Sequence, residues 1–68
     1  MNKEYKKYKA KIDEKDFVIE QDNPDIGWYL YVYENGKCVK DHLQDDLETT
    51  KTQAKEEYGV PENAWTEL

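Results

Sequence analysis

The chain has few of the residues that build covalent cross-links or membrane segments. Its 68 residues include one cysteine, two prolines and three glycines. A single cysteine excludes an intramolecular disulfide and is typical of the reducing cytoplasm. No apolar stretch approaches the roughly 20 residues that span a bilayer. The lysine-rich start leads into no apolar signal core. We therefore expect one small cytoplasmic domain over residues 1–68, with residues 1–6 frayed and no membrane contact.

The patterns of common catalytic, cofactor and metal sites are also missing. The glycines stand alone and form no phosphate-binding loop. Cys38 and His42 are the only classical nucleophile and base. Four residues along a strand separate them by ~13 Å, which is too far for a shared zinc ion with bonds of ~2.0–2.3 Å. Enclosed pockets of several hundred Å³ are also hard to build in a chain this short. We predict a non-enzymatic protein without cofactor or metal.

Negative charge exceeds positive charge, but unevenly along the chain. The net charge is −6. Residues 1–15 carry six lysines and three acids, a balance of +3, whereas residues 16–68 carry four lysines and thirteen acids, a balance of −9. An acidic body repels nucleic acid and anionic membrane surfaces. It favours encounter with a basic protein partner, and it also serves plain solubility.

The most informative segment of the sequence runs from Trp28 to Leu43 and predicts a β-hairpin. Asn35-Gly36 lies between two β-prone runs, and both residues tolerate the positive φ of a type I′ turn. A two-residue loop would place Glu34 opposite Lys37, Tyr33 opposite Cys38, Val32 opposite Val39 and Tyr29 opposite His42.

Side chains alternate along a strand, so this register sorts the hairpin into two faces. The face expected to be core holds Trp28, Leu30, Val32, Val39 and Leu43. The other face holds Tyr29, Tyr31, Tyr33, Cys38, Lys40 and His42. Tyrosine combines apolar area with a hydroxyl and is enriched at interface hot spots. Strand propensity alone also explains the tyrosines.

Two more strands and one helix complete the prediction. Residues 7–12 alternate lysine with apolar residues, as in a protected edge strand, and tyrosine spacing leaves a helix open as an alternative. Residues 17–20 form a second strand, and residues 22–27 a turn. Apolar periodicity predicts a helix from Leu47 to Tyr58, with Asp45 as its cap and Gly59 ending it. Residues 62–68 form either a helical turn or a short closing strand.

The element order predicts an α+β fold, an antiparallel β-meander of three to four strands with one C-terminal α-helix packed on one face. The stretch WYLYVYENGKCVKDHLQDDLETTKTQAKEEYGVPENAW resembles small bacterial or phage domains of uncharacterised function. These domains share an aromatic hairpin, an acidic-capped helix and a YGVPxxAW-type ending. The resemblance implies a compact α+β fold and a bacterial or phage origin, and it implies no activity or site residue.

We predict a protein-binding module, an adaptor, immunity-like protein or inhibitor for a basic partner. Its expected binding surface comprises Tyr29, Tyr31, Tyr33, Lys40 and His42. The alternative is a nucleic-acid-binding module that combines the lysine-rich N-terminal segment with the tyrosine strip. The chain would be a monomer or a weak homodimer, because an uncovered tyrosine face or edge strand can pair with itself.

Overall fold

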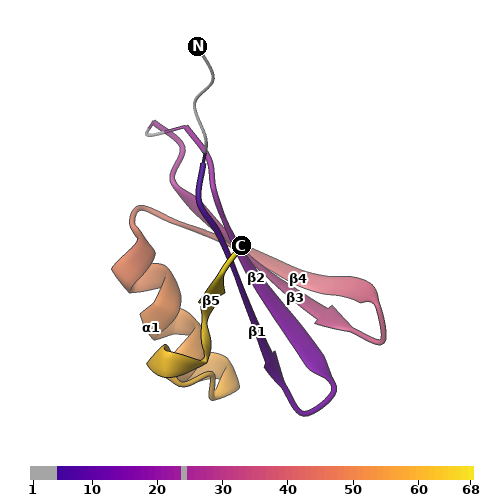
Figure 1. The fold of residues 1–68 in the computed structure, drawn as a ribbon. Helices are drawn as coiled ribbons and strands as arrows, with labels where there is room; N and C mark the ends of the chain where they lie inside the picture. The colour runs from indigo at the N-terminus through magenta and orange to yellow at the C-terminus, as the bar shows by residue number, and fades with distance from the viewer. Residues whose placement is uncertain (1–4, 24) are drawn as a thin grey trace.

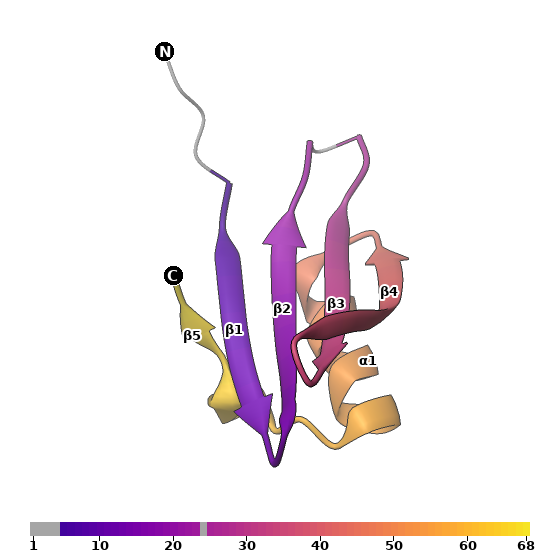
Figure 2. The same cartoon turned by 90° about the vertical axis from the view of Figure 1, so that its right-hand side faces the viewer.

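The computed structural model describes residues 5–23 and 25–68 and shows a five-stranded antiparallel sheet with one α-helix on one face (Figures 1 and 2). The strands are β1 (Lys7–Ile12), β2 (Lys15–Gln21), β3 (Trp28–Glu34), β4 (Lys37–Gln44) and β5 (Thr66–Glu67). They lie in the order β4-β3-β2-β1-β5. The helix is α1 (Leu47–Tyr58), followed by a 3₁₀ turn, η1 (Glu62–Ala64).

The α+β class is confirmed, but the strand count and the position of the helix differ from the prediction. The sheet has five strands rather than three to four, and α1 is followed by η1 and β5. The last residues form both of the structures that the sequence left open, a helical turn and a closing strand. The chain end thereby returns to the sheet beside β1.

Residues 7–12 form a strand as predicted, although β1 is not an edge strand. On one side it pairs with β2, with Ala10 opposite Phe17. On the other side Lys9 pairs with Thr66 of β5, and the Leu68 N–H donates to the Lys7 carbonyl at 2.8 Å. Of the residues expected to fray, 1–4 lie outside the described part of the chain. Next to them, the Lys6 N–H donates to Gln21 Oε1 at 2.9 Å, and Tyr5 and Asn23 are joined by a side-chain hydrogen bond.

The turn between β3 and β4 has the predicted geometry, but the pairing register of the two strands differs from the prediction beyond Cys38. Asn35 and Gly36 have φ of 54° and 80°, as a type I′ turn requires. Tyr33 pairs with Cys38 as expected. The next pair joins Val32 to Lys40, so a β-bulge leaves Val39 without a partner. An unpaired residue reverses which face the following side chains occupy, because their period is two.

The core lies between the sheet and α1. Its fully buried apolar members come from β1, β2, β3, α1 and the segment after α1: Ala10, Phe17, Ile19, Leu30, Val32, Ala54 and Val60. Trp28 and Trp65 pack partly against them. The predictions for Val39 and Leu43 were wrong, since these side chains are 46% and 50% exposed. The bulge turns them out of the core-facing row.

The helix matches its predicted bounds and differs at its cap. Asp46, rather than Asp45, is the N-cap residue, and its carboxylate accepts a 2.7 Å hydrogen bond from the Thr49 N–H. Gly59 ends the helix in the left-handed conformation at φ 76°, and Val60 beyond it is buried. Both ends of α1 are therefore set by local sequence.

Candidate functional site

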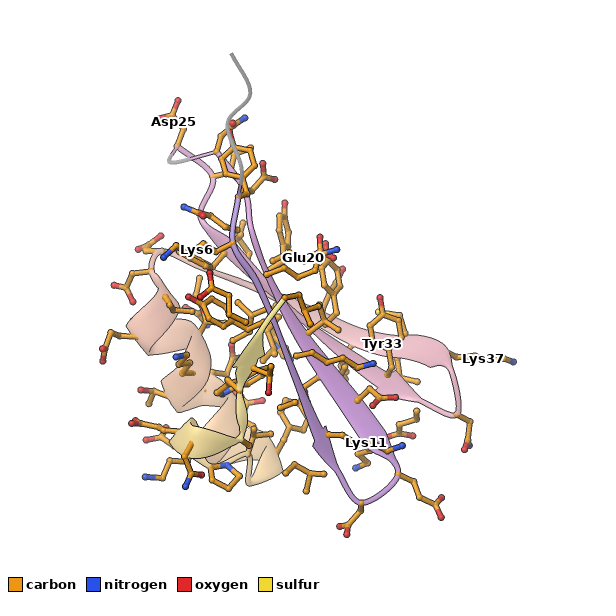
Figure 3. All side chains as sticks on the ribbon, in the orientation of Figure 1. Lys6, Lys11, Glu20, Asp25, Tyr33 and Lys37 are labelled. Carbon is orange, nitrogen blue, oxygen red and sulfur yellow. The ribbon has the colours of Figure 1, made fainter. Side chains whose placement is uncertain are left out.

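The sheet face opposite α1 carries the tyrosine row of β3, and we call it the open face. Cross-strand pairing places its side chains in three rows across β4, β3, β2 and β1: Leu43–Tyr29–Glu20–Lys7, Asp41–Tyr31–Val18–Lys9 and Cys38–Tyr33–Asp16–Lys11. Figure 3 shows the labelled side chains of Glu20 and Tyr33 on the side of the sheet away from the helix.

Two of the predicted site residues do not lie on this face. Lys40 pairs with Val32, and His42 pairs with Leu30, so both belong to the helix side. The structure joins His42 to the helix instead. Its Nε2 lies 2.9 Å from the Tyr58 hydroxyl, and its Nδ1 lies 3.1 Å from Gln53 Nε2. The bulge at Val39 is the cause, because it shifts every later β4 residue by one position.

The same shift brings two residues to the tyrosines that the sequence did not suggest. Asp41 stands opposite Tyr31, and Leu43 stands opposite Tyr29. A cation and an imidazole are therefore replaced beside the tyrosines by a carboxylate and a leucine. Predicting this exchange from the sequence would have required the position of the bulge. Valine is common in regular strands, so Val39 gives no sequence signal for a bulge.

Each tyrosine of the open face has one carboxylate as its cross-strand neighbour. Glu20 is opposite Tyr29, Asp41 is opposite Tyr31, and Asp16 is opposite Tyr33. The pKa of Tyr31 is raised above its ordinary value, first by desolvation and then by the negative charge of Glu20, with smaller contributions that include Asp41. Each tyrosine therefore has a negative charge on one of its two neighbouring strands.

The remaining neighbours of the tyrosines are apolar or weakly polar. Tyr31 has Val18 on its other side, and Tyr29 has Leu43, which is 50% exposed. The rings of Tyr29 and Tyr31 stack, with centroids 5.7 Å apart and planes inclined by 16°. All three tyrosines of β3 are half-buried. Together these side chains form an apolar strip that still contacts solvent.

A shallow hollow of about 370 Å³ lies over β2 on the same face. Asp16, Val18 and Glu20 contribute to its lining from β2, together with Lys7 and Lys9 of β1 and with Tyr33 of β3. Lys7 Nζ lies 3.5 Å from a Glu20 carboxylate oxygen. Positive and negative charges balance in this hollow, and its open shape suits a surface contact better than an enclosed small-molecule site.

No helix among the described residues lies over the open face, although the tip of the β3–β4 hairpin curls toward it and Gly36 lines the hollow together with Lys7 and Lys9. Figure 2 views the molecule with α1 behind the sheet, and only the first part of β4 curls in front of the end of β3. The described N-terminal residues continue into β1 within the sheet. The open face therefore has no counterpart of the helix that covers the other face.

The two residues that suggested chemistry lie on opposite sides of the sheet. Cys38 is exposed in the Tyr33 row of the open face, and His42 faces α1. Within residues 5–23 and 25–68, no group of three or more histidine, cysteine or acidic side chains is arranged to hold a metal ion. In the same part of the chain, no helix is both long and apolar enough to cross a membrane.

Comparison with protein-family models, with curated proteins and with solved structures gave no match for this chain. The resemblance to small bacterial or phage domains stays a prediction.

Proposed function

We propose that this protein is a non-enzymatic protein-binding module, an adaptor, immunity-like protein or inhibitor, that binds a positively charged partner through the open face. The observation that supports this proposal is the half-buried tyrosine row with no helix over it and with Asp41 and Leu43 at its side. The revised binding surface keeps Tyr29, Tyr31 and Tyr33. It replaces Lys40 and His42 by Asp41 and Leu43.

Tyrosine rows of this kind supply affinity at low entropic cost. A tyrosine side chain has only two rotatable side-chain angles before its hydroxyl, and it buries a large area on contact. Tyr29 and Tyr31 already restrain each other by stacking. The carboxylates beside them attract a cationic partner and repel an anionic one.

Nucleic-acid binding is the second candidate, because Lys7, Lys9 and Lys11 lie on the open face. These lysines are separated from the tyrosines by β2, which presents Asp16 and Glu20 between them. Phosphates near the stacked bases would meet those carboxylates. We expect no binding of labelled single-stranded DNA or RNA at low salt and micromolar protein. Binding that is lost in Lys9→Glu would favour this second function.

A capture experiment with two variants tests the proposed surface. Wild-type protein, Tyr31→Ala and His42→Ala are immobilised, and proteins retained from a lysate of the source cells are identified by mass spectrometry. We expect one basic protein to be retained by wild type and by His42→Ala but lost with Tyr31→Ala. Retention by all three, or loss with His42→Ala alone, would contradict the open face as the binding surface.

Melting temperatures separate binding from folding in the same experiment. Tyr31→Ala should melt only several degrees below wild type, because the side chain is half-buried and its loss should cost about 1 kcal/mol. A large drop in its melting temperature would show that the tyrosine row is a second core, which would end the proposal.

A further inference from the structure

The middle row of the open face contains Asp41, which is one of several charged residues of this face, with Asp16, Lys9 and Lys11, that form no ion pair among the described residues. Asp41 is exposed on β4, and among the residues that the structure describes it forms no ion pair. Tyr31 is its direct cross-strand neighbour. Cβ atoms of such neighbours lie ~4.5–5.5 Å apart. An aromatic ring and a free carboxylate are therefore available to one ligand group.

We infer that Tyr31 and Asp41 bind the guanidinium group of an arginine that the partner presents. This inference rests on the proposed function, since it names the chemistry of the partner at that same surface. A guanidinium is planar and stacks on an aromatic face, while its N–H groups donate to a carboxylate in pairs. Tyr31 supplies the ring, and Asp41 supplies the acceptor oxygens.

The aromatic pairs of the described residues leave one side of the Tyr31 ring unstacked. Tyr29 occupies the other side, at 5.7 Å between ring centroids. Tyr33 forms no aromatic pair among the described residues. Successive side chains on one strand face are ~6.6 Å apart, which is nearly twice a carbon contact distance of ~3.5–4.0 Å. A planar group between two rings needs two such contacts, ~7–8 Å, so it enters between Tyr31 and Tyr33 only when one of the two rings tilts outward.

Carboxylates stand on both sides of that space. Asp41 lies across from Tyr31 on β4, and Asp16 lies across from Tyr33 on β2. An inserted guanidinium would thus have a ring above and below and a carboxylate toward each neighbouring strand. A lysine ammonium has the charge for this position but neither the planar shape nor the paired donors.

A second copy of this chain is the competing occupant, and its composition argues against it. Its ten basic residues are all lysines, so a second copy has no guanidinium to present. The β1 lysines of a second copy could reach Asp41 only as single point charges. The geometry therefore points to a different protein that carries an exposed arginine.

Two labelled peptides test this inference on the intact protein. One is a glycine-serine peptide with three arginines, and the other has lysines at the same positions. Fluorescence anisotropy should show the arginine peptide binding about 5-fold tighter than the lysine peptide. Asp41→Asn and Tyr31→Ala should each weaken arginine-peptide binding about 10-fold. Glu56→Gln removes the same charge from the exposed surface of α1, and it should change binding less than about 2-fold.

The outcomes distinguish this inference from the proposed function. Equal affinities for the two peptides, or equal effects of Asp41→Asn and Glu56→Gln, would show unspecific charge attraction and overturn the arginine site. Concentration-dependent dimers in sedimentation that disappear in Asp41→Asn would overturn it in favour of a second copy. Neither result bears on the capture experiment, whose own outcomes and melting-temperature control decide the proposed function.

Discussion

The two faces of this sheet are built from neighbouring residues of the same strands and differ in almost every physical property. On the covered face Leu30 and Val32 are 0% and 1% exposed beneath α1. On the open face the alternating residues Tyr29, Tyr31 and Tyr33 contact solvent and have carboxylates as neighbours. The covered face forms the core with α1, whereas the open face has no helix over it.

One residue in β4 determines the chemistry of the open face. Without the bulge at Val39, Lys40 and His42 would stand beside the tyrosines, and the strip would be flanked by positive charge. With the bulge, Asp41 and Leu43 stand there instead. A register shift of one residue thus exchanges a lysine and a histidine for an aspartate and a leucine beside the tyrosines, with no change in composition.

The largest difference between the faces should appear when one ring is removed from each. Phe17 is 1% exposed and contacts the Tyr58 ring at 5.5 Å between centroids. Phe17→Ala should lower the free energy of unfolding by about 3–5 kcal/mol, close to the whole stability of a domain this small. Tyr31→Ala should cost about 1 kcal/mol. Urea denaturation measures both, and similar losses for the two variants would refute the distinction.

A smaller loss of folding free energy is expected at Gly27, which directly precedes β3. Gly27 has φ of 120°, and a Cβ added there would lie 2.2 Å from the Gln44 carbonyl oxygen. Gly27→Ala should therefore cost about 3 kcal/mol. Gly36→Ala is the matched control, since its φ is 80° but its Cβ would meet nothing within 4 Å. That control should lose about 1 kcal/mol, and equal losses would remove the steric argument.

The third prediction concerns the residue whose face the sequence assigned wrongly. His42→Ala removes the hydrogen bonds to Tyr58 and Gln53, which join β4 to α1. The free energy of unfolding should fall by about 1–2 kcal/mol. Binding to the arginine peptide should stay at the wild-type level. Weakened peptide binding without a loss of stability would indicate that the His42 side chain lies on the open face, which would contradict the register described here.

The smallest expected effect lies at the start of α1, away from the open face. The Thr49 N–H bonded to the Asp46 carboxylate lowers the pKa of that carboxyl. Its pKa is therefore lower in the folded state than in the unfolded chain, so its contribution is complete above the unfolded pKa and is lost as pH falls through the folded pKa. Asp46→Ala should melt slightly below wild type at pH 7.

Thermal melts at pH 7 and at decreasing pH below 4 measure this difference. The gap between wild type and Asp46→Ala should close as the medium becomes more acidic. Thr52→Ala, at an exposed and uncharged position of the same helix, serves as the control and should show no such closing. A gap that persists at the lowest pH would mean that the cap does not act through its carboxylate.

Local signals in the sequence predicted most of the fold. Asn35-Gly36 fixed the turn, apolar periodicity fixed the helix, and alternation fixed the strand over residues 7–12. The fifth strand was harder to predict from the sequence, because Thr66–Glu67 is short and pairs with β1, which is far away along the chain. Alternation along β3 also predicted the tyrosine row. The β4 residues beside the tyrosines, Asp41 and Leu43, were not predicted, because a bulge depends on how the whole hairpin twists and packs.

The central claim is that the bulge places Asp41, rather than Lys40, opposite Tyr31. Cross-strand nuclear Overhauser effects in the hairpin test it directly, because paired residues bring their Cα atoms to ~4.5–5.5 Å. We predict contacts between Tyr31 and Asp41 and between Leu30 and His42. Contacts between Tyr31 and Lys40 and between Tyr29 and His42 would contradict the account.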